Sequence, residues 1–233
     1  MTRIDEDMTL GDVVNRRPGA ARVLQAFDLD FCCGGDRPLS AACAERGIDT
    51  SVVMDALADV PLAASPDWVA MGPVELVDHL EATHHAYLHR ELEFLDVLAE
   101  KVAAVHGGRH PELLDVLADF RELTDDLVPH LAKEEQVLFP MIRRLAGGEV
   151  PEFGSVEAPI SVMLREHDAA GALLSQLRAR TGGFHVPDDA CSSYWSLYSG
   201  LEELEANTHL HVHKENNVLF PAVVALEAQL ATR

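Results

Sequence analysis

The sequence has little positive charge, and it lacks long apolar runs. Its 18 Lys and Arg residues face 39 Asp and Glu residues, which gives a formal net charge of −21. Such an acidic surface repels phosphate backbones and anionic lipid, so we expect neither nucleic acid nor a membrane as a partner. No run of about 18 apolar residues occurs, and the stretch from Met1 to Met8 lacks the apolar segment of a signal peptide. The sequence therefore predicts no transmembrane helix and no export signal.

Cysteines and strand signals are also scarce. The four cysteines, two of them adjacent, do not form the pattern of a disulfide framework in a chain of 233 residues. We therefore expect a reducing compartment, the cytoplasm. Helical periodicity is common along the chain and strand patterns are poor, which predicts an all-α protein.

The distribution of helix signals and helix breakers predicts two domains. Residues 1–60 hold short helical segments and predict a small helical module. Residues 61–72 carry two prolines, a serine and a glycine, and are expected to form a linker. Residues 73–233 hold longer helical segments, expected at about 73–104, 111–144, 157–180 and 188–230, which predict an antiparallel four-helix bundle.

One stretch of the predicted bundle occurs twice. Its copies begin at His130 and His211, and both read His-x-x-Lys-Glu-x-x-Val-Leu-Phe-Pro. Another histidine precedes each copy at a similar distance along the chain, His85 before the first and His167 before the second. Self-similarity of this kind indicates a duplicated supersecondary unit.

The spacing within each copy points to metal chemistry. On an α-helix, residues i and i+4 lie on one face roughly 6 Å apart, so His130 can converge with Glu134, and His211 with Glu215. With His85 and His167, a bundle core would hold imidazoles and carboxylates suited to iron, manganese or zinc. Two carboxylates able to bridge favour two metal ions. One copy alone would be interpreted as a surface ion pair, but the duplication beside the same apolar Val-Leu-Phe favours the metal site.

Other histidines on the predicted helices are also candidates for metal ligands. His89 lies one turn after His85 and is expected to be a second ligand or a supporting donor. The remaining helix histidines are expected outside the site: His79 and His84 facing solvent or hydrogen-bonding to another helix, and His209 and His213 exposed.

A second unusual feature is Cys32-Cys33, which precedes Gly34-Gly35. The glycines predict a turn, and Asp36 is expected to cap the next helix. Backbone N–H groups and the positive end of that helix would lower the pKa of the thiols, and thiolates bind soft metals, sulfur species and nitrosyl groups. The alternative is two small apolar residues packed beside a tight turn.

These motifs together resemble a known family. The two His-x-x-x-Glu pairs, each preceded by a histidine, resemble the hemerythrin-like domain. Combined with Cys-Cys-Gly-Gly, they resemble the iron–sulfur cluster repair di-iron proteins, also called repair-of-iron-centres proteins. The resemblance covers nearly the whole chain and extends to Asp78-His79, to 160–163 and to Glu166-His167-Asp168.

The resemblance implies a carboxylate-bridged centre of two iron ions in a hemerythrin-like bundle. The ligands it implies are His85, His130, Glu134, His167, His211 and Glu215. Asp126 and Glu166 stand where the family carries acidic residues near the iron site. Cys32 and Cys33 would relay iron, sulfur or nitric oxide. The implied partners are damaged iron–sulfur proteins and the small ligands NO or O₂.

The implied function is repair of iron–sulfur clusters damaged by nitric oxide or oxidative stress, with donation of iron as one route. Two other functions stay open: a di-iron enzyme that reduces NO or O₂, and a hemerythrin-like gas or redox sensor. The sequence does not decide whether the protein is an enzyme, and it is compatible with a homodimer.

Overall fold

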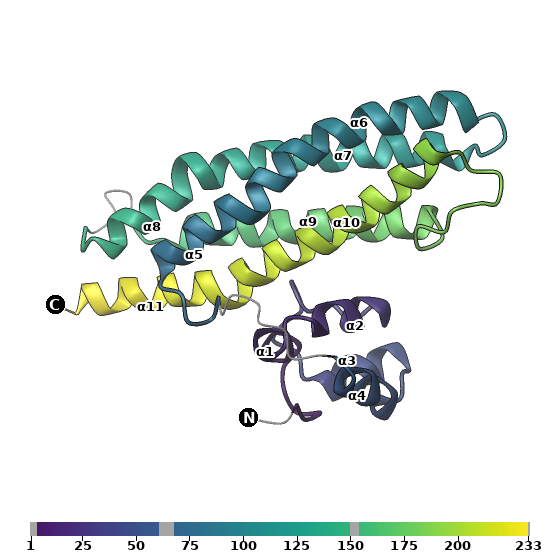
Figure 1. Ribbon diagram of the computed structural model, residues 1–233. Coiled ribbons are helices and arrows are strands. Elements are labelled where there is room, and N and C mark those ends of the chain that lie inside the picture. Colours follow the sequence, from purple (N-terminus) through teal and green to yellow (C-terminus); the bar gives the residue numbers. More distant parts are fainter. Residues whose placement is uncertain (1–3, 61–67, 150–153, 233) are drawn as a thin grey trace.

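Helices supply nearly all the regular structure in the computed structural model, which describes residues 4–60, 68–149 and 154–232 (Figure 1). Within these residues no β-strand forms, and the one extended pairing is an isolated bridge between Thr9 and Pro38. The predicted all-α fold class is confirmed.

The N-terminal part consists of short helices. They are α1 (Leu10–Arg16), α2 (Ala20–Ala26), α3 (Leu39–Arg46) and α4 (Thr50–Ala58). The Thr9 hydroxyl accepts the Asp12 N–H at 3.1 Å and caps α1, and the Asp49 carboxylate caps α4. Helix α3 begins after Pro38, so the prediction that Asp36 caps it is wrong. It ends at Gly47, whose φ of +67° is the left-handed conformation that glycine adopts without strain.

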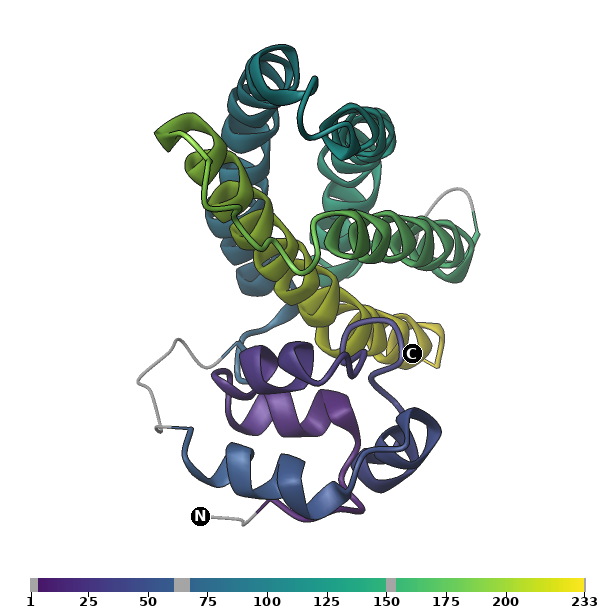
Figure 2. The same ribbon diagram turned by 90° about the vertical axis from the view of Figure 1, so that its right-hand side faces the viewer.

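Four long rods form the bundle (Figures 1 and 2). Three of the rods contain a π-helical turn, here labelled η, between two α-helical segments. In chain order the rods are α5 (Pro73–Leu80), η1 (Glu81–His85) and α6 (Ala86–His106); α7 (Glu112–Lys133), η2 (Glu134–Leu138) and α8 (Phe139–Ala146); α9 (Glu157–Arg180); and α10 (Ser192–Lys214), η3 (Glu215–Leu219) and α11 (Phe220–Ala231).

Apolar side chains at helical spacing hold the rods together. Leu88, Leu92 and Leu95 lie on one face of α6 and are all buried, as the period of 3.6 residues requires. Gly200 lets α10 approach this face closely, because a Cβ at that position would lie 2.6 Å from Leu95 Cδ2. None of the helices in the described segments is long and apolar enough to cross a membrane.

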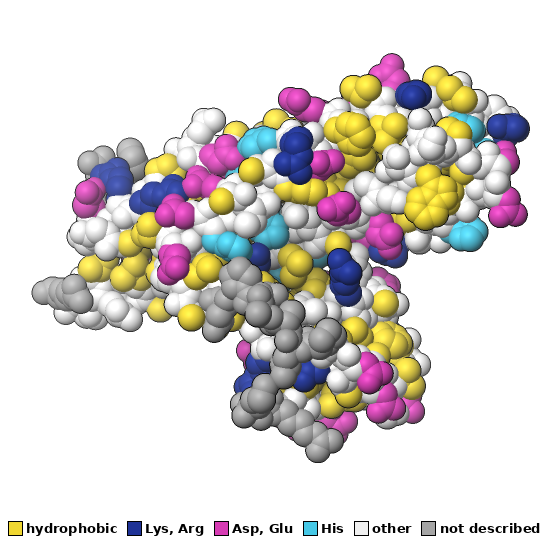
Figure 3. All heavy atoms as spheres, in the orientation of Figure 1, with side chains coloured by type: hydrophobic (Ala, Val, Ile, Leu, Met, Phe, Trp, Pro, Cys, Tyr) yellow, Lys and Arg dark blue, Asp and Glu magenta, His cyan; other side chains and the backbone are white. Residues whose placement is uncertain are grey.

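The N-terminal part packs against the side of the bundle formed by α10, η3 and α11 (Figures 1 and 2). Asn217 Nδ2 donates to the Cys32 carbonyl at 3.0 Å, and Gln25 Nε2 donates to Glu205 Oε2 at 2.6 Å. One apolar cluster runs through both parts and joins Leu10 to Phe220. Figure 3 shows acidic side chains on both parts of the surface.

The predicted linker, 61–72, is described only in part, because 61–67 lie outside the described residues. Trp68 is buried, and its Nε1 donates to Asn15 Oδ1 at 3.2 Å. The end of the segment is therefore packed between the N-terminal helices and the bundle.

Candidate metal centre

The structure gathers the six residues implied as ligands into the bundle core. Their donor atoms form two groups: His85, Glu134, His211 and Glu215 in one, and His130, Glu134, His167 and Glu215 in the other. Within each group the donor atoms all lie within 4.8 Å of one another, and both glutamates belong to both groups. All six residues are buried. The two copies of the repeated motif thus form two similar halves of one site.

The distances repeat between the halves. His85 Nε2 lies 3.4 Å from Glu134 Oε2, and His130 Nε2 lies 3.4 Å from Glu134 Oε1. Around the other carboxylate, His167 Nε2 is 3.1 Å from Glu215 Oε2, and His211 Nε2 is 3.2 Å from Glu215 Oε1. Each glutamate therefore has one oxygen toward each group, which is the arrangement a bridging carboxylate needs.

Three of the four imidazoles are oriented through their other ring nitrogen. The Nδ1–H of His85 donates to Glu135 Oε1 at 2.9 Å. That of His130 donates to Glu166 Oε2 at 2.9 Å. His167 Nδ1–H donates to the amide oxygen of Asn216 at 2.8 Å. A proton held on Nδ1 leaves the Nε2 lone pair facing the site, as in metal-binding histidines.

Burial sets the protonation of these groups. It is the largest cause that lowers the pKa of His85 and of His130 to about 4, so both rings are neutral at neutral pH. Burial, and then the charge of Glu215, raises the pKa of Glu134 well above its usual range. Two carboxylates in this dry core stay ionised together only if a cation lies between them.

The site fits metal ions on a direct structural test. Both oxygens of Glu134 and Oε2 of Glu215 are buried and receive no hydrogen bond from any described residue. The Nε2 atoms of His85, His130 and His167, whose ring protons are held on Nδ1, present lone pairs to the site. Electron-pair donors that converge without a proton between them require cations, and mixed imidazole and carboxylate donors suit iron, manganese or zinc.

The predicted supporting acids have different positions. Glu166, on α9, reaches His130 and also pairs with Lys133. Asp126 is exposed and makes no hydrogen bond or ion pair with a described residue, but it lines a pocket of about 130 Å³ together with His130 and Glu166. His89 is exposed as well, and its Nε2 donates to Glu135 Oε1 at 2.8 Å, so it supports the acid beside His85.

Sequence reasoning missed Glu135 and Asn216, the partners of His85 and His167. Both directly follow the glutamate of the repeated motif, at the same position in the two copies. That shared position was the signal that could have found them.

A second polar cluster lies beside the centre. His84 is buried and stacks on His211, with ring centroids 5.4 Å apart. Lys214 Nζ donates to His84 Nε2 at 2.8 Å and to His79 Nε2 at 2.9 Å. Of the two alternatives for His79 and His84, the hydrogen bond to another helix is the one the structure shows. The Lys214 ammonium also lies 4.6 Å from the centroid of the Trp68 ring.

The expectation that His209 and His213 are exposed is wrong. His213 is fully buried, and its Nδ1 lies 3.2 Å from the Phe31 carbonyl. His209 is partly buried, with its ring edge toward Phe31 at a centroid distance of 6.1 Å. The helix pattern placed both on an outer face of the bundle, and the N-terminal part covers that face.

Asp30 fixes the backbone of the loop that carries the adjacent thiols. Its carboxylate accepts the backbone N–H groups of Cys32, Cys33 and Gly34 at 3.1, 2.9 and 2.9 Å. The expectation of a lowered thiol pKa is wrong for Cys32. The hydrogen bond to Cys33 and then burial raise the pKa of Cys32 well above its usual range. Both thiols are free, with their sulfurs 3.8 Å apart.

Comparison with known proteins agrees with this architecture. The sequence profile of the hemerythrin HHE cation binding domain matches residues 76–223. A profile described as a domain of unknown function, DUF542, matches residues 6–61. A Haemophilus influenzae protein named probable iron-sulfur cluster repair protein is 35% identical over 211 residues, covering 89% of this chain and 92% of the relative. The iron-sulfur cluster repair protein YtfE of Escherichia coli O157:H7 is 35% identical over 224 residues, covering 95% and 98%.

Proposed function

The chain belongs to the family of iron–sulfur cluster repair proteins with a hemerythrin HHE domain, and on that premise we propose that it restores clusters damaged by nitric oxide or oxidative stress. Its partners are then damaged iron–sulfur proteins. We also propose NO or O₂ as small ligands and the cytoplasm as its compartment, since all four cysteines are free. A homodimer stays a prediction.

The observation that carries the proposal is the pair of buried glutamates shared by two groups of imidazoles. His85 and His211 would hold one iron, His130 and His167 the other, and Glu134 and Glu215 would bridge them. When bound, iron supplies a redox-active Lewis acid. Glu135, Glu166 and Asn216 keep the imidazole lone pairs aimed at the centre.

The charge of this donor set supports iron donation as the route of repair. Two carboxylates and neutral imidazoles carry less negative charge than the positive charge of two ferrous ions. A buried site whose ligands do not neutralise the full positive charge of the metal ions binds them less tightly than a carboxylate-rich site would. We propose Cys32 and Cys33 as the relay for iron, sulfur or nitric oxide between the bundle and the damaged cluster.

The test is a repair assay. A [4Fe–4S] dehydratase inactivated by nitric oxide or peroxide is mixed anaerobically with the iron-loaded protein, with no free iron present, and recovered activity is followed. The proposal predicts recovery that is lost in Glu134→Ala/Glu215→Ala. Glu93→Ala is the control, because Glu93 is exposed on α6 and belongs to neither donor group. Equal recovery with the double variant contradicts the proposal. Steady consumption of NO or O₂ without recovery would favour a gas-reducing enzyme instead.

A further inference from the structure

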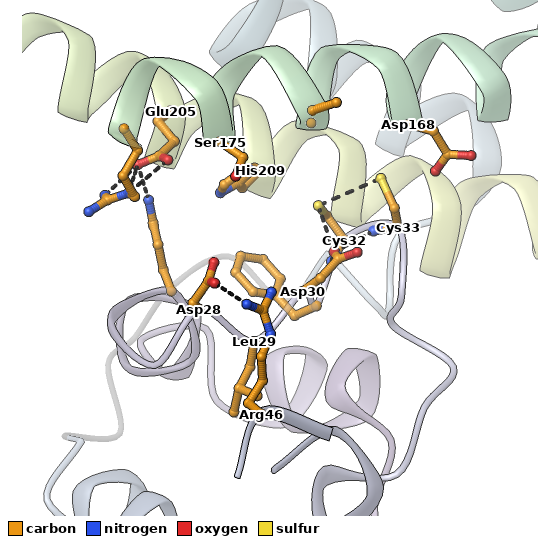
Figure 4. A pocket seen from close by; sticks show the side chains of 15 residues that line it. Asp28, Leu29, Asp30, Cys32, Cys33, Arg46, Asp168, Ser175, Glu205 and His209 are labelled. Carbon is orange, nitrogen blue, oxygen red and sulfur yellow. Dashed lines mark hydrogen bonds and ion pairs between the residues drawn. The ribbon is translucent and has the colours of Figure 1, made fainter. Parts of the chain in front are cut away.

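A cavity of about 250 Å³ lies between the N-terminal part and the bundle (Figure 4). Cys32 and Cys33 line it from the N-terminal loop, and Asp168 and His209 line it from α9 and α10. Gly171 of α9 contributes open space, because a Cβ there would meet nothing within 4 Å. The thiols therefore face an internal space with room for an ion and its water.

The loop in this cavity has the composition of a metal site. Donor atoms of Asp30, Cys32 and Cys33 all lie within 4.8 Å of one another. The loop is fixed in that shape by the backbone N–H groups that Asp30 accepts, and Cys32 is only 6% exposed. Asp30 Oδ2 receives one hydrogen bond, from Gly34, so a lone pair of this oxygen stays available.

The charges around the cavity favour a cation. Its two arginines are already paired, Arg46 with Asp28 and Arg178 with Glu205. Among the described residues, no lysine or arginine forms an ion pair with Asp30 or Asp168. Two unpaired carboxylates thus remain beside two sulfurs, and the combination attracts a positive ion while the sulfurs select a thiophilic one.

We propose that Asp30, Cys32 and Cys33 form a third metal site, for a single thiophilic divalent cation of the Fe(II) or Zn(II) class. Binding breaks the two S–H bonds, forms two metal–sulfur bonds and releases two protons to water, with no change in oxidation state. Open coordination positions face the cavity, which allows the cation to leave again.

A direct link joins this site to the bundle centre. Asn216 accepts from His167 Nδ1 through its amide oxygen, and its Nδ2 donates to the Cys32 carbonyl at 3.3 Å. One side chain therefore contacts both a ligand of the bundle centre and the cysteine loop. A role for this site in passing iron from the bundle to a damaged cluster rests on the proposed function. The claim that the site binds a cation does not.

Cobalt(II) tests the binding site in the full-length protein. The bundle is first loaded with two irons per chain, and Co(II) is then titrated under anaerobic conditions. We expect one further equivalent to bind with thiolate-to-cobalt charge-transfer absorption. Cys32→Ser/Cys33→Ser should weaken this binding by at least about 100-fold. Cys191→Ser, which removes an exposed thiol elsewhere, should bind cobalt like the wild type.

A second measurement covers the case in which the double variant fails to fold. In the wild type with its bundle already loaded with iron, one equivalent of Zn(II) should slow alkylation of Cys32 and Cys33 and leave that of Cys191 unchanged. The proposed site is contradicted if the thiolate-to-cobalt band is absent, or if the band survives in Cys32→Ser/Cys33→Ser. It is also contradicted if Zn(II) protects neither thiol from alkylation. Repair of clusters without cobalt binding would remove the site and leave the proposed function. Cobalt binding in a protein without repair activity would support the third metal site and contradict the proposed function.

Discussion

At the scale of single residues, the two copies of the repeated motif carry different side chains directly after the glutamate. Glu135 in the first half accepts from His85, and Asn216 in the second accepts from His167. A carboxylate can only accept, whereas an amide has a donor as well. The amide is found in the half that faces the N-terminal part, where its donor bonds to the Cys32 carbonyl.

Asn216→Asp tests this interpretation. The new carboxylate can still accept from His167, but it would face the Cys32 carbonyl without a proton to donate. Loss of a hydrogen bond worth about 1 kcal/mol should open the loop about fivefold more often, and alkylation of Cys32 should accelerate by that factor. The matched control is Glu135→Gln in the other half, which should leave the alkylation rate unchanged. Equal rates in all three proteins would contradict the coupling.

Cys191 provides a second prediction at this scale. Cys191 is exposed at the N-cap position of α10, and the backbone N–H groups of Tyr194 and then of Ser193 lower the pKa of its thiol. A lowered pKa means more thiolate at neutral pH, so the pH–rate profile for alkylation of Cys191 should have its midpoint below that of a free cysteine. Mass spectrometry of the labelled peptide gives the rate, and the denatured protein is the control. A midpoint that does not change on denaturation would refute the prediction.

At the scale of elements, three ligands of the centre lie in π-helical turns. His85 ends η1, Glu134 begins η2, and Glu215 begins η3. A π turn widens the helix by one residue and is common at functional sites. In the two copies of the repeated motif, η2 and η3 begin four residues after His130 and His211, at the glutamates that lie in the core.

The loop before α3 lies so close to η3 that it depends on Gly35. A Cβ at Gly35 would lie 2.7 Å from the Phe31 carbonyl oxygen and would also collide with Asn217 Oδ1. A Cβ at Gly34 would meet only the flexible end of Arg37, at 2.8 Å. Gly35→Ala should therefore lower the free energy of unfolding in urea by about 1–3 kcal/mol, against less than about 0.5 for Gly34→Ala. Equal losses would show that the close approach does not matter.

The helices also show how much of the structure could be predicted from the sequence. Helix α9 has the predicted bounds, and the repeated His-x-x-x-Glu pairs converge, because 3.6-residue periodicity and i, i+4 spacing are local properties. The π turns were missed because the sequence pattern reads as continuous helix. The burial of His213 depends on contacts between segments far apart in the chain, which no local pattern records.

At the scale of the whole molecule, metal binding and folding are linked. Only the folded chain brings the four imidazoles and two carboxylates together, so ions that bind it shift the unfolding equilibrium. Metal at a thousandfold excess over its dissociation constant should add about 4 kcal/mol, or about 10 °C in Tm for a chain of this size. Calorimetry with and without Fe(II), on Cys32→Ser/Cys33→Ser protein so that only the bundle binds metal, measures the shift, and the further change Glu134→Ala/Glu215→Ala should show none. A shift of equal size after that further change would place the bound metal elsewhere.

The most direct measurement of the central claim is the number of irons held in the bundle. Metal analysis is made after anaerobic loading and removal of free iron, on Cys32→Ser/Cys33→Ser protein so that only the bundle contributes. The structure predicts two irons per chain, because two donor groups share both glutamates, and fewer than one after the further change Glu134→Ala/Glu215→Ala. A single iron per chain, or two that survive loss of both carboxylates, would contradict the account.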